Sequence, residues 1–190
     1  MTYGNDIQFG YFLTPDATVY PELLRRARLC DESGYDLIGI QDHPYQSRFL
    51  DTWTLLAVLA AQTSRVRLFP DVVNLPLRPP AMLAKAAASL DVMSGGRVEL
   101  GLGAGAFWEG IRAMGGETRT PGEAVDALED AIHIIRLLWS GERGRRYEGR
   151  FYQLRGAHSG PVPAHPMGIW LGALGPRMLN LTGRLADGWV

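Results

Sequence analysis

Cysteine is almost missing from this chain of 190 residues: Cys30 stands alone, so no disulfide framework can form. A single cysteine is typical of proteins that fold in a reducing compartment, and we expect a cytoplasmic location. No run approaches the roughly 20 apolar residues that span a bilayer. The first residues, Met1–Asp6, have neither the basic segment nor the apolar run of a signal peptide. These absences predict a protein without membrane partners.

An excess of either charge is also missing, because the formal net charge is -1 at pH 7. A near-neutral chain with mixed charges gives no electrostatic reason to bind nucleic acid, so a small molecule is the expected partner. With 46% hydrophobic residues, the chain can bury a substantial core. We expect residues 1–190 to form a single domain.

What the chain does contain is a regular alternation of short β-type runs with longer runs of helical spacing. The expected strands are residues 7–13, 36–40, 66–73, 98–102 and 168–173, with a sixth beginning at 188. The expected helices are residues 21–33, 51–63, 79–93 and 122–140, with another opening at 175–176. Pro70 donates no ladder hydrogen bond, so a bulge or distortion is expected in the third strand. Residues 141–167, rich in Gly, Pro and Arg, break the rhythm as an excursion before the fifth strand.

Strands that alternate with amphipathic helices predict parallel pairing through helical crossovers. The glycine fingerprint of a dinucleotide-binding fold does not follow the first strand, so a TIM-type (β/α) barrel is favoured over a doubly wound sheet. A complete barrel takes about 250 residues, whereas only about five to six of its eight βα units are recognisable here. The predicted barrel is therefore incomplete. We expect a chain truncated at its C-terminus, the ordered part of a longer one, or a protein completed by a partner.

Asp42 and His43 follow the second strand directly, and in such folds the active site lies at the carboxyl ends of the strands. An imidazole titrates near neutral pH and can deliver or accept a proton beside a reacting centre. A neighbouring carboxylate can orient it. The pair can equally be a turn cap beside a partly buried histidine. The dipeptide alone does not decide between these readings.

Two glycine-containing turns also follow strands. Gly103, Ala104 and Gly105 let backbone approach a ligand closely, but their spacing is not a dinucleotide motif. Gly175-Pro176 opens a helix whose free amides would suit a phosphate, or it is an ordinary turn. The four histidines show no tight ligand spacing, so no metal site is predicted.

Several stretches, taken together and in order, resemble the bacterial luciferase-like family of flavin- and deazaflavin-dependent oxidoreductases. They are Ala27–Asp36, Asp42-His43, Leu77–Pro80, Leu90–Gly105 and Gly172–Trp189. The resemblance implies a (β/α) barrel, a homodimer, and either coenzyme F420 (a deazaflavin) or FMN at the barrel mouth, with F420 slightly favoured.

The resemblance also implies roles for particular residues. His43 would lie near the reactive face of the ring as the main catalytic residue, with Asp42 orienting it. The cofactor-binding residues would be Asp71 and Val72, where family members often carry a non-prolyl cis peptide, together with Asn74, the loop of Gly103, Ala104 and Gly105, and the phosphate turn of Leu174, Gly175 and Pro176.

Three functions follow from these observations. The first is a flavin- or deazaflavin-dependent oxidoreductase that carries out hydride transfer or monooxygenation of a small organic substrate. The second is a non-catalytic or degenerate flavin-binding protein. The third is an unrelated (β/α) barrel hydrolase or isomerase that uses Asp42 and His43 as acid and base.

Overall fold

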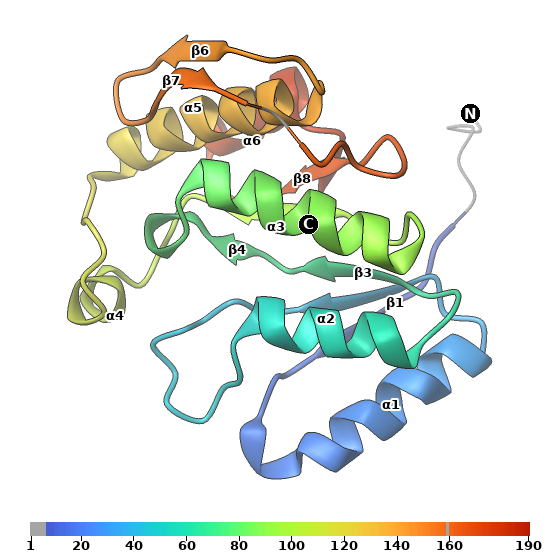
Figure 1. Ribbon diagram of the computed structural model, residues 1–190. Coiled ribbons are helices and arrows are strands. Elements are labelled where there is room, and N and C mark those ends of the chain that lie inside the picture. Colours follow the sequence, from blue (N-terminus) through green and yellow to red (C-terminus); the bar gives the residue numbers. More distant parts are fainter. Residues whose placement is uncertain (1–6, 159) are drawn as a thin grey trace, which may run out of the picture.

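A computed structural model of the protein describes residues 7–158 and 160–190. The parallel strands are β1 (Gly10–Leu13), β2 (Leu37–Ile40), β3 (Arg67–Pro70), β4 (Val73–Asn74), β5 (Leu100–Gly103), β8 (Ile169–Leu171) and β9 (Gly188–Trp189). The helices are α1 (Tyr20–Glu32), α2 (Thr52–Gln62), α3 (Pro80–Ser94), α4 (Trp108–Ala113), α5 (Pro121–Trp139) and α6 (Pro176–Leu185). Figure 1 shows these elements and the antiparallel hairpin of β6 (Arg145–Glu148) and β7 (Gln153–Ala157) that lies over α5.

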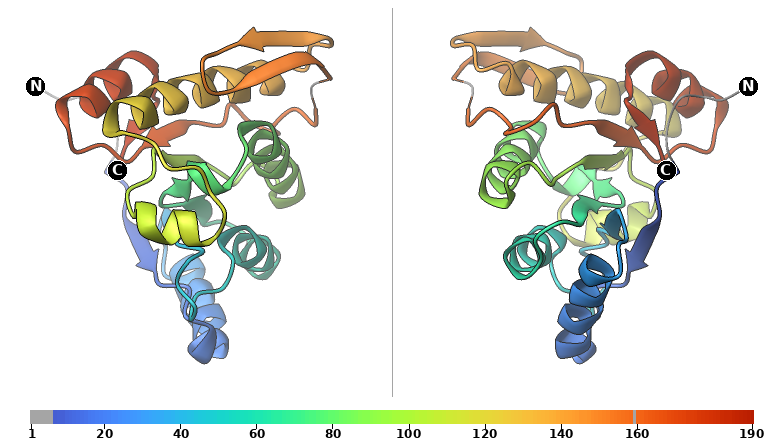
Figure 2. Two further views of the ribbon diagram at one scale, coloured as in Figure 1. Left: turned by 90° about the vertical axis from the view of Figure 1, so that its left-hand side faces the viewer. Right: turned by 90° about the vertical axis from the view of Figure 1, so that its right-hand side faces the viewer.

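The parallel strands follow one another in chain order. One sheet has the order β1-β2-β3 and the next has the order β4-β5-β8-β9. A parallel bridge between Leu68 and Val98 joins the two. Viewed onto the carboxyl ends of the strands, they form an arc with the helices on its convex outer side (Figure 2, left). This is the predicted α/β architecture, with five complete βα units and the start of a sixth strand.

The third predicted strand, residues 66–73, is not continuous. β3 ends at Pro70, β4 begins at Val73, and the Asp71–Val72 peptide between them is cis. The distortion that Pro70 predicted is therefore confirmed, and so is the non-prolyl cis peptide. Gly101 on β5 allows this close passage, since a Cβ there would lie 2.1 Å from the Pro70 carbonyl oxygen.

Residues 141–167 contain more regular secondary structure than the sequence predicted. β6 and β7 pair antiparallel, and Leu154 of β7 is buried against α5. Asp130 on α5 accepts hydrogen bonds from the Tyr147 hydroxyl (2.9 Å) and from the amides of Phe151 (2.8 Å) and Tyr152 (3.3 Å). This one buried carboxylate therefore ties the hairpin to α5.

The core lies between the sheet and the helices that cover it. Its fully buried side chains include Leu13, Ile38, Leu56, Leu68 and Leu100. Cys30 is buried and forms no disulfide, and the expected cytoplasmic location stays a prediction. Within the described ranges no helix is long and apolar enough to cross a membrane. The same residues contain no group of three or more His, Cys, Asp or Glu that could hold a metal ion.

Candidate active site at the carboxyl ends of the strands

A cavity of about 290 Å³ lies at the carboxyl ends of β2, β4, β5 and β8. Most of the residues predicted to form the site line it. Its lining consists of Asp42, His43, Tyr45, Val72, Val73, Asn74, Gly103, Ala104, Gly105, Ala106, Gly172, Leu174, Gly175 and Met178. The strand ends thus bring together residues that are more than 130 positions apart in the sequence.

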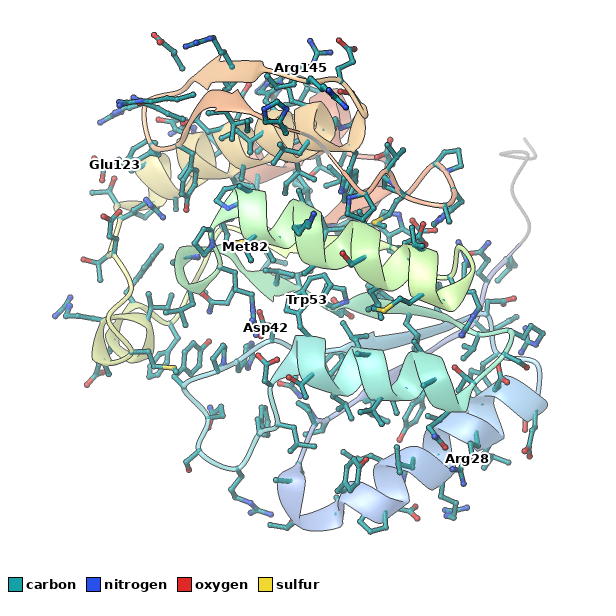
Figure 3. All side chains as sticks on the ribbon, in the orientation of Figure 1. Arg28, Asp42, Trp53, Met82, Glu123 and Arg145 are labelled. Atoms are coloured by element: carbon teal, nitrogen blue, oxygen red, sulfur yellow. The ribbon has the colours of Figure 1, made fainter. Side chains whose placement is uncertain are left out.

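Asp42 is buried and its carboxylate accepts three hydrogen bonds within the protein. Its carboxylate receives two hydrogen bonds from Arg78, one from Nε and one from Nη2, each of 2.7 Å. The Asn74 amide donates a third, of 3.0 Å. Figure 3 shows Asp42 beside the start of α2. A carboxylate held in this way orients the backbone around it.

Arg78 connects this carboxylate to a helix. Its Nη2 also donates to Asp51 (2.6 Å), whose carboxylate caps the N-terminus of α2 through the Thr54 amide. Burial lowers the pKa of Arg78, but the hydrogen bonds and charges of Asp42 and Asp51 outweigh it and raise that pKa. The guanidinium therefore stays charged and fixes the loop after β2 to the start of α2, while Asp42 itself binds the Asn74 amide of β4. The sequence did not predict this role, although Arg78 lies in one of the family-like stretches.

His43 lies at the cavity with its side chain exposed. Its ring stacks on Tyr45, with centroids 5.5 Å apart and planes 17° from parallel. Tyr45 in turn meets the Phe107 ring edge-on at 5.1 Å. Burial raises the pKa of the Tyr45 hydroxyl, so the phenol stays neutral at physiological pH. Tyr45 was not predicted, and the only signal for it was an aromatic residue two positions after His43.

Asn74 lines the cavity and has an unsatisfied acceptor. The residue is 6% exposed, and its Oδ1 has no hydrogen-bond partner among the residues that the structure describes. A buried polar atom without a partner costs about 1–3 kcal/mol. A ligand with an N–H group at this point would remove that cost.

Val72 reaches the cavity from the cis peptide, and two glycines make room for it. A Cβ at Gly103 would lie 2.6 Å from Val72 Cγ2, and one at Gly172 would lie 3.2 Å from the same atom. Asp71, its neighbour, does not line this cavity. Its side chain lies in a separate one on the inner side of the sheet.

The last predicted element of the site is the turn before α6. Leu174 is 95% exposed at the cavity, Gly175 is the N-cap residue, and Pro176 is the first helical residue. No side chain caps this helix, so its first amides remain available to a ligand. Pro176 itself is not part of the lining.

Comparison with known proteins places these features in a family. The family model described as luciferase-like monooxygenase matches residues 7–190. A 5,10-methylenetetrahydromethanopterin reductase of Archaeoglobus fulgidus is 34% identical over 184 residues, which cover 96% of this chain and 52% of that protein. An F420-dependent glucose-6-phosphate dehydrogenase of Microbacterium testaceum is 33% identical over 97% of this chain and 56% of its own length. The chain thus spans about half the length of these relatives.

Solved structures agree on the fold. An F420-dependent secondary alcohol dehydrogenase, solved with an F420-acetone adduct, matches with a TM-score of 0.88 at 22% identity, over 97% of this chain and 58% of that one. A monooxygenase from Streptomyces bottropensis matches with a TM-score of 0.81 at 27% identity, over 94% of this chain and 57% of that one.

Proposed function

The chain belongs to the luciferase-like monooxygenase family, and from that premise we propose that it is an oxidoreductase that holds a deazaflavin or flavin ring in the cavity at the strand ends. Coenzyme F420 is the favoured cofactor, because several of the most similar relatives bear F420-dependent names; FMN is the alternative. The substrate is a small organic molecule. Family membership excludes the third alternative, an unrelated barrel hydrolase or isomerase.

One observation carries this proposal: Asn74, which has an unpartnered buried acceptor, and His43, which has an exposed imidazole, line the same cavity. The pyrimidine part of a flavin or deazaflavin ring carries N–H groups, and Asn74 Oδ1 is an acceptor that lacks one. The residues present therefore fit such a ring. When bound, the deazaflavin supplies the hydride chemistry.

The remaining roles belong to the protein's own residues. His43 holds or moves the proton that accompanies hydride transfer, and Tyr45 supports its ring by stacking. Asp42, fixed by Arg78, positions the loop that carries His43. Val72 packs against the ring from behind. The free amides at the start of α6 bind the anionic tail of the cofactor.

The test is a titration of the purified protein with F420 and, separately, with FMN, followed by fluorescence. His43→Ala should bind cofactor within a few-fold of the wild type yet lose about 10²–10⁴ in turnover, the usual size of a general acid–base contribution. His158→Ala is the matched control, because His158 is an exposed histidine outside this cavity and should change neither quantity. Turnover is assayed with secondary alcohols and glucose 6-phosphate as hydride donors.

The possible outcomes of this titration distinguish the alternatives. If neither cofactor binds, the proposal is wrong. Tight binding with no turnover under any donor would favour the non-catalytic flavin-binding alternative over the oxidoreductase. If His43→Ala turns over at the wild-type rate, the proton-handling role of His43 fails while the cofactor site stands.

A homodimer is the proposed assembly, with α2 and α3 as the contact. α2 has no charged residue, and α3 has only Lys85 and the buried Asp91. In contrast, α1 carries six charged residues. Between α2 and α3 lies a cavity of about 250 Å³ that includes Trp53 and Met82 in its lining, and Figure 3 shows Trp53 in the space between these helices. Trp53 Nε1 is buried without a hydrogen-bond partner in the described chain, and Met82 is 64% exposed.

These features support a contact in which a second copy covers the apolar face and supplies an acceptor for the indole N–H. Met82→Glu should convert a dimer into a monomer, measured by light scattering after size exclusion. Leu29→Glu introduces the same charge on the outer side of α1 and should leave the dimer intact. A wild-type protein that is monomeric at micromolar concentration would contradict the proposed assembly.

A further inference from the structure

Helix α4 packs directly against the two aromatic rings that support His43. Its Gly110 lies against both of them, since a Cβ there would be 2.8 Å from Tyr45 Cγ and 2.5 Å from Phe107 Cδ1. Tyr45 meets the Phe107 ring edge-on and stacks on the imidazole of His43. Figure 2 (left) shows α4 in front of the strand ends. A displacement of α4 would therefore move the Tyr45 ring and, with it, the imidazole.

The position of α4 depends on the segments that flank it. The helix has only six residues, and its N-cap residue Phe107 makes no side-chain cap hydrogen bond within the described chain. A helix of this length is marginal by itself, so packing has to hold it in place. Residues 114–120 connect α4 to α5 and contain Gly115 and Gly116, which give the backbone conformational freedom. This connection therefore has to be held at its far end if α4 is to stay in place.

Arg119 holds that end through the β6–β7 hairpin. Its side chain is 7% exposed, although that of Glu117, its ion-pair partner at 3.1 Å, is 83% exposed. The guanidinium carbon Cζ lies 5.4 Å from the centroid of the Phe151 ring and 5.3 Å from that of the Tyr152 ring. Ring faces attract a cation, and they do so more strongly where water is excluded. The two rings therefore bind the guanidinium and fix the end of the connection.

The residues on both sides of this contact are themselves fixed to α5. The amides of Phe151 and Tyr152 donate to the buried carboxylate of Asp130, at 2.8 and 3.3 Å. Thr120, directly after Arg119, is the N-cap residue of α5 and forms a capping box with Glu123. The rings therefore form a fixed surface, and Arg119 ties the segment behind α4 to it.

We propose that Arg119 is a positioning residue for His43. Its guanidinium, held against the hairpin rings, fixes the segment behind α4, and α4 in turn holds Tyr45 against the imidazole. The consequence for turnover rests on the proposed function of His43. The position of the His43 ring does not, and it can be measured without cofactor or substrate.

The experiment follows the ring protons of His43 by NMR in the cofactor-free protein, with the signals assigned from His43→Ala. Stacking on Tyr45 shields these protons, so Tyr45→Leu gives the reference for an unstacked imidazole. Arg119→Met keeps the bulk of the side chain but removes its charge, and should move the His43 signals toward that reference. The same variant should bind F420 within a few-fold of the wild type and lose about tenfold or more in kcat, since a misplacement of about 1 Å can cost about 10²-fold.

Arg150→Met is the matched control. Arg150 lies over the same Phe151 ring, at 4.9 Å, but its side chain is 66% exposed and it belongs to the hairpin, so its removal leaves the segment behind α4 in place. It should change neither the His43 signals nor kcat. Arg119→Lys keeps a charge against the rings and should lie closer to the wild type than Arg119→Met in both quantities.

Phe151→Leu removes one of the two rings from the hairpin side and should move the His43 signals in the same direction; it serves as the test if Arg119→Met does not fold. The proposal is overturned if the folded Arg119→Met or Phe151→Leu protein keeps the His43 signals of the wild type, or if Arg150→Met moves them equally far. Signals that move while kcat stays unchanged would contradict the proton-handling role of His43 and support its placement by Arg119.

Discussion

The two ends of the parallel sheet differ in how their polar groups are bound. At the carboxyl ends, polar groups are left open: His43 is exposed, Asn74 Oδ1 has no partner in the described chain, and the first amides of α6 are uncapped. These groups surround the cavity of about 290 Å³. Each of them is a group that a ligand can satisfy.

At the amino ends, Asp91 and Arg97 are each bound by several groups of the protein itself. Asp91 is fully buried and accepts the amides of Val98 (3.1 Å) and Ala164 (2.7 Å) as well as His165 Nδ1 (3.0 Å). Arg97 donates to the carbonyl oxygens of Ala60, Thr63 and Val66. Each of these side chains fastens a loop to the bottom of the sheet.

The contrast indicates that ligand binding depends on the carboxyl ends of the strands and that stability depends on the amino ends. Parallel strands concentrate free groups at their carboxyl ends, while the opposite loops only have to hold the structure together. Substitutions at the amino end should therefore reduce stability without a direct effect on ligand binding. Substitutions at the carboxyl end should do the reverse.

The largest expected effect is at the amino end. Asp91→Asn keeps the shape of the side chain but removes the charge and turns an amide N–H₂ toward backbone donors. Because this breaks a buried hydrogen-bonded pair, we expect a loss of about 3–5 kcal/mol in the free energy of unfolding. Urea denaturation followed by circular dichroism measures it.

Asp126→Asn is the control for this substitution, since Asp126 forms surface ion pairs with Arg177 and Arg150 and its replacement should cost less than about 1 kcal/mol. The remaining folded Asp91→Asn protein should bind F420 as the wild type does. A loss of less than 1 kcal/mol, or a selective loss of cofactor binding, would show that the two ends are not separate.

Arg78 tests the comparison further, because it is hydrogen-bonded within the protein although it lies near the carboxyl ends of the strands. Lysine cannot reproduce the two parallel hydrogen bonds to Asp42 together with the bond to Asp51. Arg78→Lys should therefore lose about 1–3 kcal/mol of stability and also weaken cofactor binding, since the loop that carries His43 loses its anchor. Urea denaturation and F420 titration on the same sample separate the two effects.

The matched control is Arg25→Lys, an exposed ion pair with Glu22 on α1 that should change stability by less than about 0.5 kcal/mol. If Arg78→Lys lowers stability but leaves cofactor affinity untouched, Arg78 supports the fold alone and has no positioning role.

The sequence predicted the architecture well, because alternating strand and helix patterns are local signals. It also located the Pro70 distortion, since proline cannot donate a ladder hydrogen bond. It did not predict the β6–β7 hairpin, whose Gly- and Arg-rich strands lack a clear two-residue alternation. That hairpin is stabilised by Asp130, a contact between distant residues that no local pattern shows.

The candidate site was predictable in part. Asp42 and His43 stood out because two chemically active side chains follow a strand directly. The use of Asp42 by Arg78, 36 positions away, could not be read from the sequence, since it depends on how β2, β4 and α2 meet. The same holds for Asp71, whose side chain turned out to face a different cavity from that of Val72. Adjacent residues diverge wherever the backbone folds between two surfaces.

The smallest expected effect concerns Asp31, at the end of α1. Burial raises the pKa of this carboxyl, but hydrogen bonds from the amides of Val66, Ser64 and Arg65 outweigh it and lower the pKa from 3.8 to about 2. A depressed pKa in the folded state means that the stabilisation is present above pH 4 and disappears as the pH falls toward 2. Asp31→Asn should cost about 1 kcal/mol at pH 7, less than the full linkage value because solvent screens the partly exposed carboxylate. The cost should shrink to nothing near pH 2, measured by urea denaturation at each pH. A cost that stays constant over this range would show that the anchors of the amino end act through shape and not through charge.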